Sequence, residues 1–483
     1  MRIPILTGAL FLAAAAACSD TPSEPPPPPP VPSRLATTVT MPDSAITGAT
    51  VATLSVTVTD AQGRTVSGAF VDFSVTAGEG RLASTRVASD AQGVAQVAWT
   101  AGLLPRTNTV RASLPAAPEA AVTFTTRAVM APPMVTTRSN HTCALNTRGK
   151  AFCWGRGSAG ALGNGTTADR TEPTPVAGGL AFWSIAAGGN HTCGVAMDLR
   201  AYCWGAAMEG QLGTTTSSIA SPAPVVGNTR FVAVATGWTH TCALSTTGET
   251  WCWGRNLQGE LGAPANVAVM GLPRRVESAP SFVQLAAGGS HTCGLTGTGT
   301  AYCWGSNGRG QLGDGTTEMR REAVAVPALR FTSLAAGAAM TCGTVIGGGT
   351  YCWGDNAVGQ LGNGGLGGMA ATPQRVRPEE GFGRVAAGGS HGCGLVGTGA
   401  AACWGMNTSG QLGNLEVRDW WPFATRVWGQ YSYAVIAAGE QHTCAITSDT
   451  WVHCWGENGS GQLGDGTTEN RVVPTAVVGT RLQ

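Results

Sequence analysis

Between residues 34 and 128, apolar and polar residues alternate in short runs, the pattern of β-strands that bury one face. The runs include Leu54–Val58, Val71–Val75 and Ala95–Trp99. Segments rich in turn-forming residues separate them: DAQG at 60–63, AGEG at 77–80 and DAQG at 90–93. We expect Asp60 and Asp90 to accept hydrogen bonds from backbone N–H groups of their own turns. The alternation predicts a β-sandwich over 34–128.

From residue 129 to 483 the chain consists of seven copies of one unit. The first cysteine of each copy recurs every 49 to 51 residues, and a second cysteine follows ten residues later. The pairs are Cys143 and Cys153, Cys193 and Cys203, Cys242 and Cys252, Cys293 and Cys303, Cys342 and Cys352, Cys393 and Cys403, and Cys444 and Cys454. The pattern in each copy predicts two strands joined by a glycine-bearing turn. These two strands would be part of a small antiparallel sheet. Seven such sheets predict an all-β, seven-bladed propeller.

The ends of the repeat region suggest how the ring closes. We assign the Pro-x-x-Val segments, such as 173–176 and 474–477, to the start of the following unit. The first unit begins at Met134 without such a segment, whereas 474–483 carry one with no unit after it. We therefore expect the last strand to complete the first blade.

The paired cysteines predict disulfides within each unit. The midpoint between Cys143 and Cys153 is Arg148, inside the turn, so the two cysteines face each other across a hairpin, within reach of a disulfide. Zinc sites usually group their ligands as C-x2–4-C, a spacing that this chain lacks, and unit five has Met340 where the other units have histidine. We predict seven intra-unit disulfides and no metal, with each short loop contributing about 2–3 kcal/mol in the chain-entropy model.

The N-terminus has the features of an export signal. Residues 1–17 combine a basic start at Arg2 with an apolar stretch, too short to remain as a membrane span. Small residues followed by Cys18 resemble a bacterial lipoprotein signal, which implies cleavage before Cys18 and lipidation of its thiol. An ordinary signal cleaved near Ala17 is the alternative. Residues 18–33 include six consecutive prolines and predict a stiff, extended linker.

Two further resemblances cover most of the chain. The segment Val56–Gly102, extended by TNTVRASL and VTFTTRA, resembles bacterial Ig-like domains of the invasin and intimin type. This implies an Ig-like β-sandwich that acts as a stalk. The pattern AxGxxHTCAL…G…CWGxNxxGQLG resembles the regulator-of-chromosome-condensation repeat family, which implies a seven-bladed propeller. The namesake member is a GTPase exchange factor that uses an inserted hairpin. Unit spacings that vary by only two residues leave no room for one, so we do not expect that activity.

Charge and candidate chemistry favour binding over catalysis. The net charge is +1 and Lys150 is the only lysine, so we expect no nucleic-acid partner. Six of the seven histidines occupy one repeated position, which indicates a structural role. We find no catalytic constellation and expect no cofactor and no small-molecule substrate. Trp420 and Trp421, in the irregular segment 414–423, stand where other copies have small polar residues. They are candidate partner-binding residues, unless they pack on a neighbouring blade.

These observations predict a non-catalytic lipoprotein of the bacterial cell envelope, attached to the membrane through its lipid. Its propeller would bind a protein or glycan at the cell exterior, for adhesion or scaffolding. An inhibitor or sensor of another protein is the main alternative, and an envelope enzyme is a further one.

Overall fold

The structure of this protein is a computed structural model. It describes residues 28–37, 39, 41, 44–46, 50–78, 80–100, 107–129, 134–215, 217–377, 381–416 and 418–482. The described parts consist of β-strands and connecting loops, with a single short 3-10 helix, η1 (Ser158–Gly160). No helix in these parts has the length and apolar character needed to cross a membrane. The predicted signal and Cys18 lie outside the described residues.

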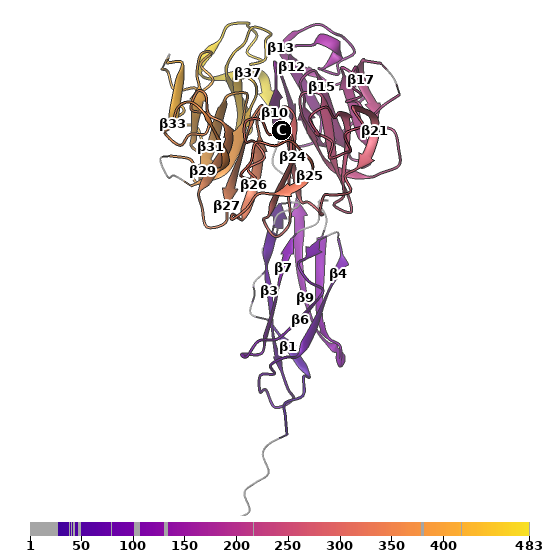
Figure 1. The fold of residues 1–483 in the computed structure, drawn as a ribbon. Coiled ribbons are helices and arrows are strands. Elements are labelled where there is room, and N and C mark those ends of the chain that lie inside the picture. Colours follow the sequence, from indigo (N-terminus) through magenta and orange to yellow (C-terminus); the bar gives the residue numbers. More distant parts are fainter. Residues whose placement is uncertain are drawn as a thin grey trace, which may run out of the picture.

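The first part of the chain forms two sheets around one apolar core (Figure 1). One sheet has the strand order β1 (Arg34–Ala36), β3 (Thr50–Thr59), β7 (Val94–Thr100) and β5 (Arg81–Leu82). The other has the order β2 (Ser44–Ile46), β9 (Ala117–Val129), β8 (Thr107–Leu114), β4 (Phe70–Ala77) and β6 (Arg86–Ala88). The alternating residues Leu54, Val56 and Val58 are buried in the shared core, as their spacing predicts. The relation to Ig-like domains of the invasin type stays a prediction.

The two predicted turn aspartates accept backbone hydrogen bonds. Asp60 Oδ1 accepts from the N–H groups of Gln62 and Arg64 at 3.0 and 2.8 Å, and Asp90 Oδ1 accepts in the same way from Gln92 and Val94. The carboxylates therefore stabilise the DAQG turns that connect the strands.

The remaining strands form seven four-stranded antiparallel sheets, which we number as blades one to seven in chain order. The first strands are β10 (Met134–Arg138), β14 (Phe182–Ala187), β18 (Phe231–Thr236), β22 (Gln284–Ala287), β26 (Phe331–Ala336), β30 (Phe382–Ala387) and β34 (Tyr433–Ala438). The second strands, which open with the His-Thr-Cys segment in most blades, are β11 (His141–Leu145), β15 (His191–Ala196), β19 (His240–Ser245), β23 (His291–Leu295), β27 (Met340–Val345), β31 (His391–Val396) and β35 (His442–Thr447).

The third strands carry the Cys-Trp-Gly segment. They are β12 (Ala151–Gly155), β16 (Ala201–Gly205), β20 (Thr250–Arg255), β24 (Ala301–Gly305), β28 (Thr350–Asp355), β32 (Ala401–Met406) and β36 (Trp451–Gly456). The fourth strands are β13 (Arg170–Pro175), β17 (Ile219–Pro224), β21 (Val269–Arg275), β25 (Arg320–Ala325), β29 (Met369–Arg375), β33 (Trp420–Arg426) and β37 (Arg471–Arg481). First strands of successive blades contact one another, so they line the centre of the ring and the fourth strands form its rim.

The expected mode of ring closure is wrong. The last strand, β37, pairs with β36 and completes blade seven, while β10 supplies the first strand of blade one. The Pro-x-x-Val segments therefore end their own blades rather than start the next, because the proline suits an edge strand with one free side. Blades one and seven share no strand, and the ring closes through contacts of β10 with β34 and of β13 with β37.

One face of the propeller, which we call the near face, meets the two-sheet unit (Figure 1). Arg81, on β5, donates a hydrogen bond to the carbonyl of Thr247 in the β19–β20 turn of blade three. A hollow of about 280 Å³ lies between Leu82 and Thr100 on one side and Val283 and Gly297 of blade four on the other. The two-sheet unit therefore occupies the near face at blades three and four.

A repeated clasp joins each blade to the next. In blade two, Thr192 Oγ1 and Trp204 Nε1 donate to the carbonyl of Ala161 in blade one, at 2.8 and 3.0 Å. His141 Nε2 of blade one lies 3.0 Å from the same Thr192 hydroxyl. The equivalent histidine–threonine pairs are His191 and Thr241, His240 and Thr292, His291 and Thr341, His391 and Thr443, and His442 and Thr142. The last pair closes the ring from blade seven to blade one.

The clasp requires a hydrogen on Nε2 of each of its histidines. The Thr192 hydroxyl has one hydrogen, which it donates to the Ala161 carbonyl, so the His141 Nε2 must carry the proton that points at the threonine. Burial lowers the pKa of His141 and His391 to about 4, and burial together with neighbouring positive groups lowers the pKa of His191 to about 3. Because burial lowers these pKa values far below 7, the clasp histidines are neutral at pH 7, with their single ring hydrogen on Nε2.

The junction from blade five to blade six keeps the tryptophan bond of the clasp, from Trp404 Nε1 to the Gln360 carbonyl at 3.0 Å, but lacks the histidine–threonine pair. Blade five has Met340 in place of the histidine, and blade six has Gly392 in place of the threonine. A side chain on Gly392 would collide with the Trp404 ring, since its Cβ would lie 2.6 Å from Trp404 Cε2. Because both polar partners are absent, no buried donor is left without an acceptor. Removing both partners costs less folding stability than removing one of them.

Candidate functional site

The structure places all fourteen repeat cysteines in disulfides within their own blades. In blade one the register pairs Cys143 with Cys153 across β11 and β12, and the sulfurs are bonded at 2.08 Å. The other six pairs have the same arrangement, each ten residues apart. Every one of these cysteines is fully buried, and in the described part of the chain no group of His, Cys, Asp and Glu side chains could hold a metal ion. The cysteines therefore brace the blades and present no reactive sulfur at the surface.

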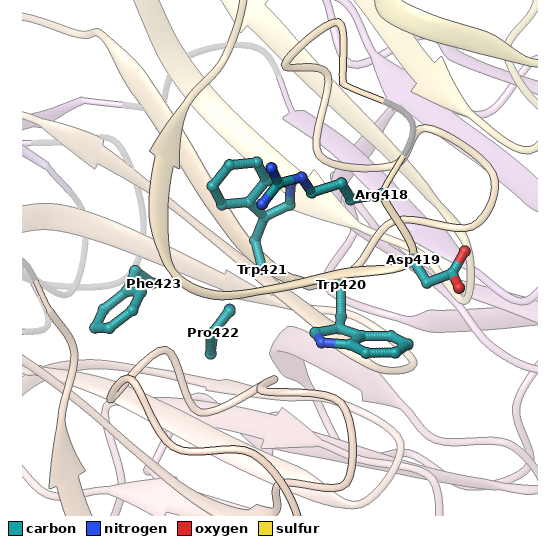
Figure 2. A pocket seen from close by; sticks show the side chains of 6 residues that line it. All are labelled: Arg418, Asp419, Trp420, Trp421, Pro422 and Phe423. Carbon is teal, nitrogen blue, oxygen red and sulfur yellow. The ribbon is translucent and has the colours of Figure 1, made fainter.

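Trp421 lies largely inside the molecule. It pairs in register with Gly405 on β32 and packs against the apolar cluster between blades six and seven. The guanidinium of Arg418 covers the outer face of its ring, 5.1 Å from the ring centre (Figure 2). Trp421 is thus partly buried against a cluster that blades six and seven share, and its ring also lines the hollow beside Trp420.

The expectation that small polar residues occupy the equivalent of Trp421 is wrong. At that register, paired with the glycine of Cys-Trp-Gly, the other blades have Arg170, Ile219, Met270, Arg320, Ala370 and Arg471. Arg320 and Arg471 form ion pairs with turn aspartates at 2.9 and 2.7 Å. Asn414 of blade six replaces the aspartate. Asn164 does the same in blade one, where Arg170 is kept, so nothing in the structure explains the indole of blade six at this position.

Trp420, one residue earlier, points to the other side of β33 and is 45% exposed (Figure 2). A hollow of about 580 Å³ at the rim of the propeller is lined by Arg418, Asp419, Trp420, Trp421, Pro422 and Phe423. Phe423 is 47% exposed. The backbone of Trp420 pairs with Met406 of β32, and the backbone of Phe423 forms a bridge with Asn363 of blade five, so strand pairing holds the backbone at both aromatic residues.

Blade five forms the other border of this surface. The N–H of Gly364 donates to the carbonyl of Pro422 at 2.9 Å, which holds the loop of blade five against β33. Gly364 has a φ of +88°, and a Cβ there would lie 2.5 Å from the Phe423 ring, so only glycine fits. Leu366, 53% exposed, lies beside Pro422 over Gly359. We call the surface formed by Leu366, Trp420, Pro422 and Phe423 the rim patch.

Three of the four residues of the rim patch, Trp420, Pro422 and Phe423, lie in the irregular segment 414–423 that the sequence singles out. Trp420 and the segment with Phe423 stood out because they depart from the repeat, but nothing in the sequence linked Leu366 to them. Leu366 comes from a different blade, 54 residues earlier than Trp420, and joins the patch only through the packing of blade five on blade six. A signal was present, since the loop 363–368 also departs from the Asp-Gly-Thr-Thr form of blades four and seven.

Comparison with protein families identifies the ring. A model described as "RCC1-like domain" matches residues 177–483, and a model of the "Regulator of chromosome condensation (RCC1) repeat" matches 148–195. The chain belongs to the RCC1-like domain family. The resemblance read from the repeat sequence is confirmed, as is the all-β propeller fold that it implies.

Curated relatives match through their RCC1-like segments alone. The human probable E3 ubiquitin-protein ligase HERC3 is 32% identical over 214 residues, which are 43% of this chain and 16% of HERC3. The Arabidopsis thaliana ultraviolet-B receptor UVR8 is 29% identical over 199 residues, covering 40% of this chain and 45% of the receptor. This RCC1-like chain thus spans less than half the length of either relative.

Solved structures agree on the fold. Prp20p of Saccharomyces cerevisiae aligns with a TM-score of 0.64 at 23% identity, over 70% of this chain and 87% of that protein. Human WBSCR16 aligns with a TM-score of 0.62 at 21% identity, over 68% and 94% of the two chains. At these identities the likeness extends to the RCC1-like propeller and no further.

Proposed function

We propose that this RCC1-like protein is a non-catalytic binding protein that captures a protein partner at the rim patch. The observation that carries the proposal is the exposure of Trp420 and Phe423 on a rigid strand, where burial would be the rule for side chains of this size. Aromatic residues that stay exposed on a fixed scaffold are the usual anchors of protein interfaces. The rim patch lies at blades five and six, away from the near face at blades three and four.

The setting that we propose is the bacterial cell envelope. A lipid on Cys18, the proline-rich linker and an Ig-like stalk would hold the propeller away from the membrane, with the rim patch accessible. Seven buried disulfides support an oxidising location outside the cytoplasm. Radiolabelled palmitate incorporated by the full chain, and lost in Cys18→Ala, tests the anchor separately from binding.

Trp420→Ala should strongly weaken capture of the partner. Full-length protein, exported and immobilised, is incubated with an extract of the host's own envelope, and retained proteins are quantified by mass spectrometry. Truncating an interface anchor costs about 2 kcal/mol or more, so we expect at least a 30-fold loss of affinity for the retained protein.

Trp451→Ala is the matched control. Trp451 is a tryptophan of similar exposure, 40%, at the start of β36 in blade seven, outside the rim patch. It should bind as the unchanged protein does. Equal retention by both variants would contradict the assignment of the rim patch, and retention of glycan without any protein would contradict the partner class.

A further inference from the structure

Blade one differs from the other six at the mouth of the central channel on the face opposite the near face. In blades two to seven a short turn between the first and second strands begins with glycine: Gly188, Gly237, Gly288, Gly337, Gly388 and Gly439. Blade one has Arg138 at this position, followed by Ser139 with a φ of +44°. The substitution falls at the blade that must close the ring without sharing a strand with blade seven.

The six glycine turns are joined by backbone hydrogen bonds. The N–H of each turn donates to a carbonyl of the next, as in Gly189 to Gly237 at 3.1 Å, Trp238 to Gly289 at 3.2 Å, Gly289 to Gly337 at 3.0 Å, Ala338 to Gly388 at 3.1 Å and Gly389 to Gly439 at 2.9 Å. Within the described residues this series runs from blade two to blade seven and makes no bond with the turn of blade one. The chain of turn contacts is therefore open at blade one.

Arg138 reaches across the ring instead. Its Nη2 donates to the carbonyl of Ala287 at 2.8 Å and its Nη1 donates to the carbonyl of Ala336 at 3.2 Å. These carbonyls end β22 and β26, the first strands of blades four and five, which lie opposite blade one in a ring of seven. The side chain is only 6% exposed. Burial lowers the pKa of Arg138 to about 10, partly offset by Glu440, so the group is still charged at neutral pH.

We propose that Arg138 is a closing latch, which holds the first strand of blade one in the ring by bonding it to the two opposite blades. A guanidinium is suited to this role because its planar donors can serve two carbonyls from one stem. The latch acts together with the last clasp, in which Thr142 Oγ1 and Trp154 Nε1 donate to the Gln462 carbonyl of blade seven at 2.9 and 3.0 Å. This inference does not depend on the rim patch or on any partner.

The latch predicts a local effect of Arg138→Met. Hydrogen exchange of backbone amides, followed by mass spectrometry on the full chain, should become at least tenfold faster in β10 and β34, the two strands at the seam. Exchange in β18, remote from the seam and from the Arg138 carbonyls, should stay unchanged. Arg138→Lys, which keeps the charge but serves fewer carbonyls, should give the same pattern to a smaller extent.

Arg148→Met is the matched control, because Arg148 is an exposed arginine in a turn of the same blade. It should exchange as the unchanged protein does. Unaltered protection of β10 and β34 in Arg138→Met would overturn the proposal. It would show that an apolar side chain replaces the buried guanidinium with no loss of stability at the seam. An equal acceleration in all seven blades would overturn it as well, because it would show a general loss of stability. If Arg138→Met does not accumulate, hydrogen exchange in Arg138→Lys is measured instead. Faster exchange confined to β10 and β34 would support the latch, and unaltered or uniform exchange would overturn it.

Discussion

Reducing the seven disulfides should unfold the propeller and leave the two-sheet unit folded. Each bond closes a loop of about ten residues and stabilises the folded state by about 2–3 kcal/mol in the chain-entropy model. Seven of them together exceed 10 kcal/mol, which is comparable with the whole net stability of a typical domain, about 5–15 kcal/mol. We therefore expect the reduced propeller to have no folded population at 37 °C.

The measurement is chemical denaturation followed by tryptophan fluorescence, with and without reductant. Because every cysteine of the repeats is buried, the protein must be reduced in denaturant, and refolding is then followed on dilution. Residues 34–128 contain no cysteine, so their unfolding transition is an internal control that should not move. A propeller that refolds after reduction with an unchanged midpoint would contradict the stabilising role of the bonds.

Acidification should destabilise the propeller steeply between pH 6.5 and pH 4. Burial lowers the pKa of the clasp histidines from 6.5 to about 4 in His141 and to about 3 in His240 and His442, so the unfolded chain binds more protons than the folded one in this range. Stability is therefore complete above pH 6.5 and is lost as the pH falls. Each histidine contributes a slope of about 1.4 kcal/mol per pH unit, and six act together.

Thermal unfolding midpoints recorded from pH 8 to pH 4.5 at constant ionic strength test this expectation. His191→Met provides the control, because Met340 already fills the same position in blade five. That variant should remain folded at pH 7.5 and should lose stability with acid about one sixth less steeply. A midpoint that stays constant from pH 7.5 to pH 5 would show that the histidines are not buried as neutral members of the clasp.

Much of the framework could be predicted from the sequence because it depends on local spacing. The midpoint of Cys143 and Cys153 falls in a turn, and a hairpin then has to place the two side chains opposite each other. In the two-sheet unit, the period-two alternation identifies the buried face because successive side chains of a strand point in opposite directions. The seven histidines of the chain could likewise be divided into six framework residues and one other from their repetition alone.

The phase of the repeat could not be predicted in the same way. A period of about 50 residues stays the same wherever the unit is cut, so the Pro-x-x-Val strand fits equally well at the start of one blade and at the end of another. The structure decides for the end, since β37 pairs with β36. The contribution of Leu366 to the rim patch and the Arg138 latch could not be predicted for a related reason. Each depends on residues of different blades, which only the packing of the ring brings together.

Disulfide mapping of the native protein tests the braced propeller most directly. Proteolysis without reduction, followed by mass spectrometry, should recover seven cross-linked peptides, each joining the two cysteines of one blade, ten residues apart. Free thiols throughout the repeats, or bonds between different blades, would contradict both the braced propeller and the oxidising location that we propose for it.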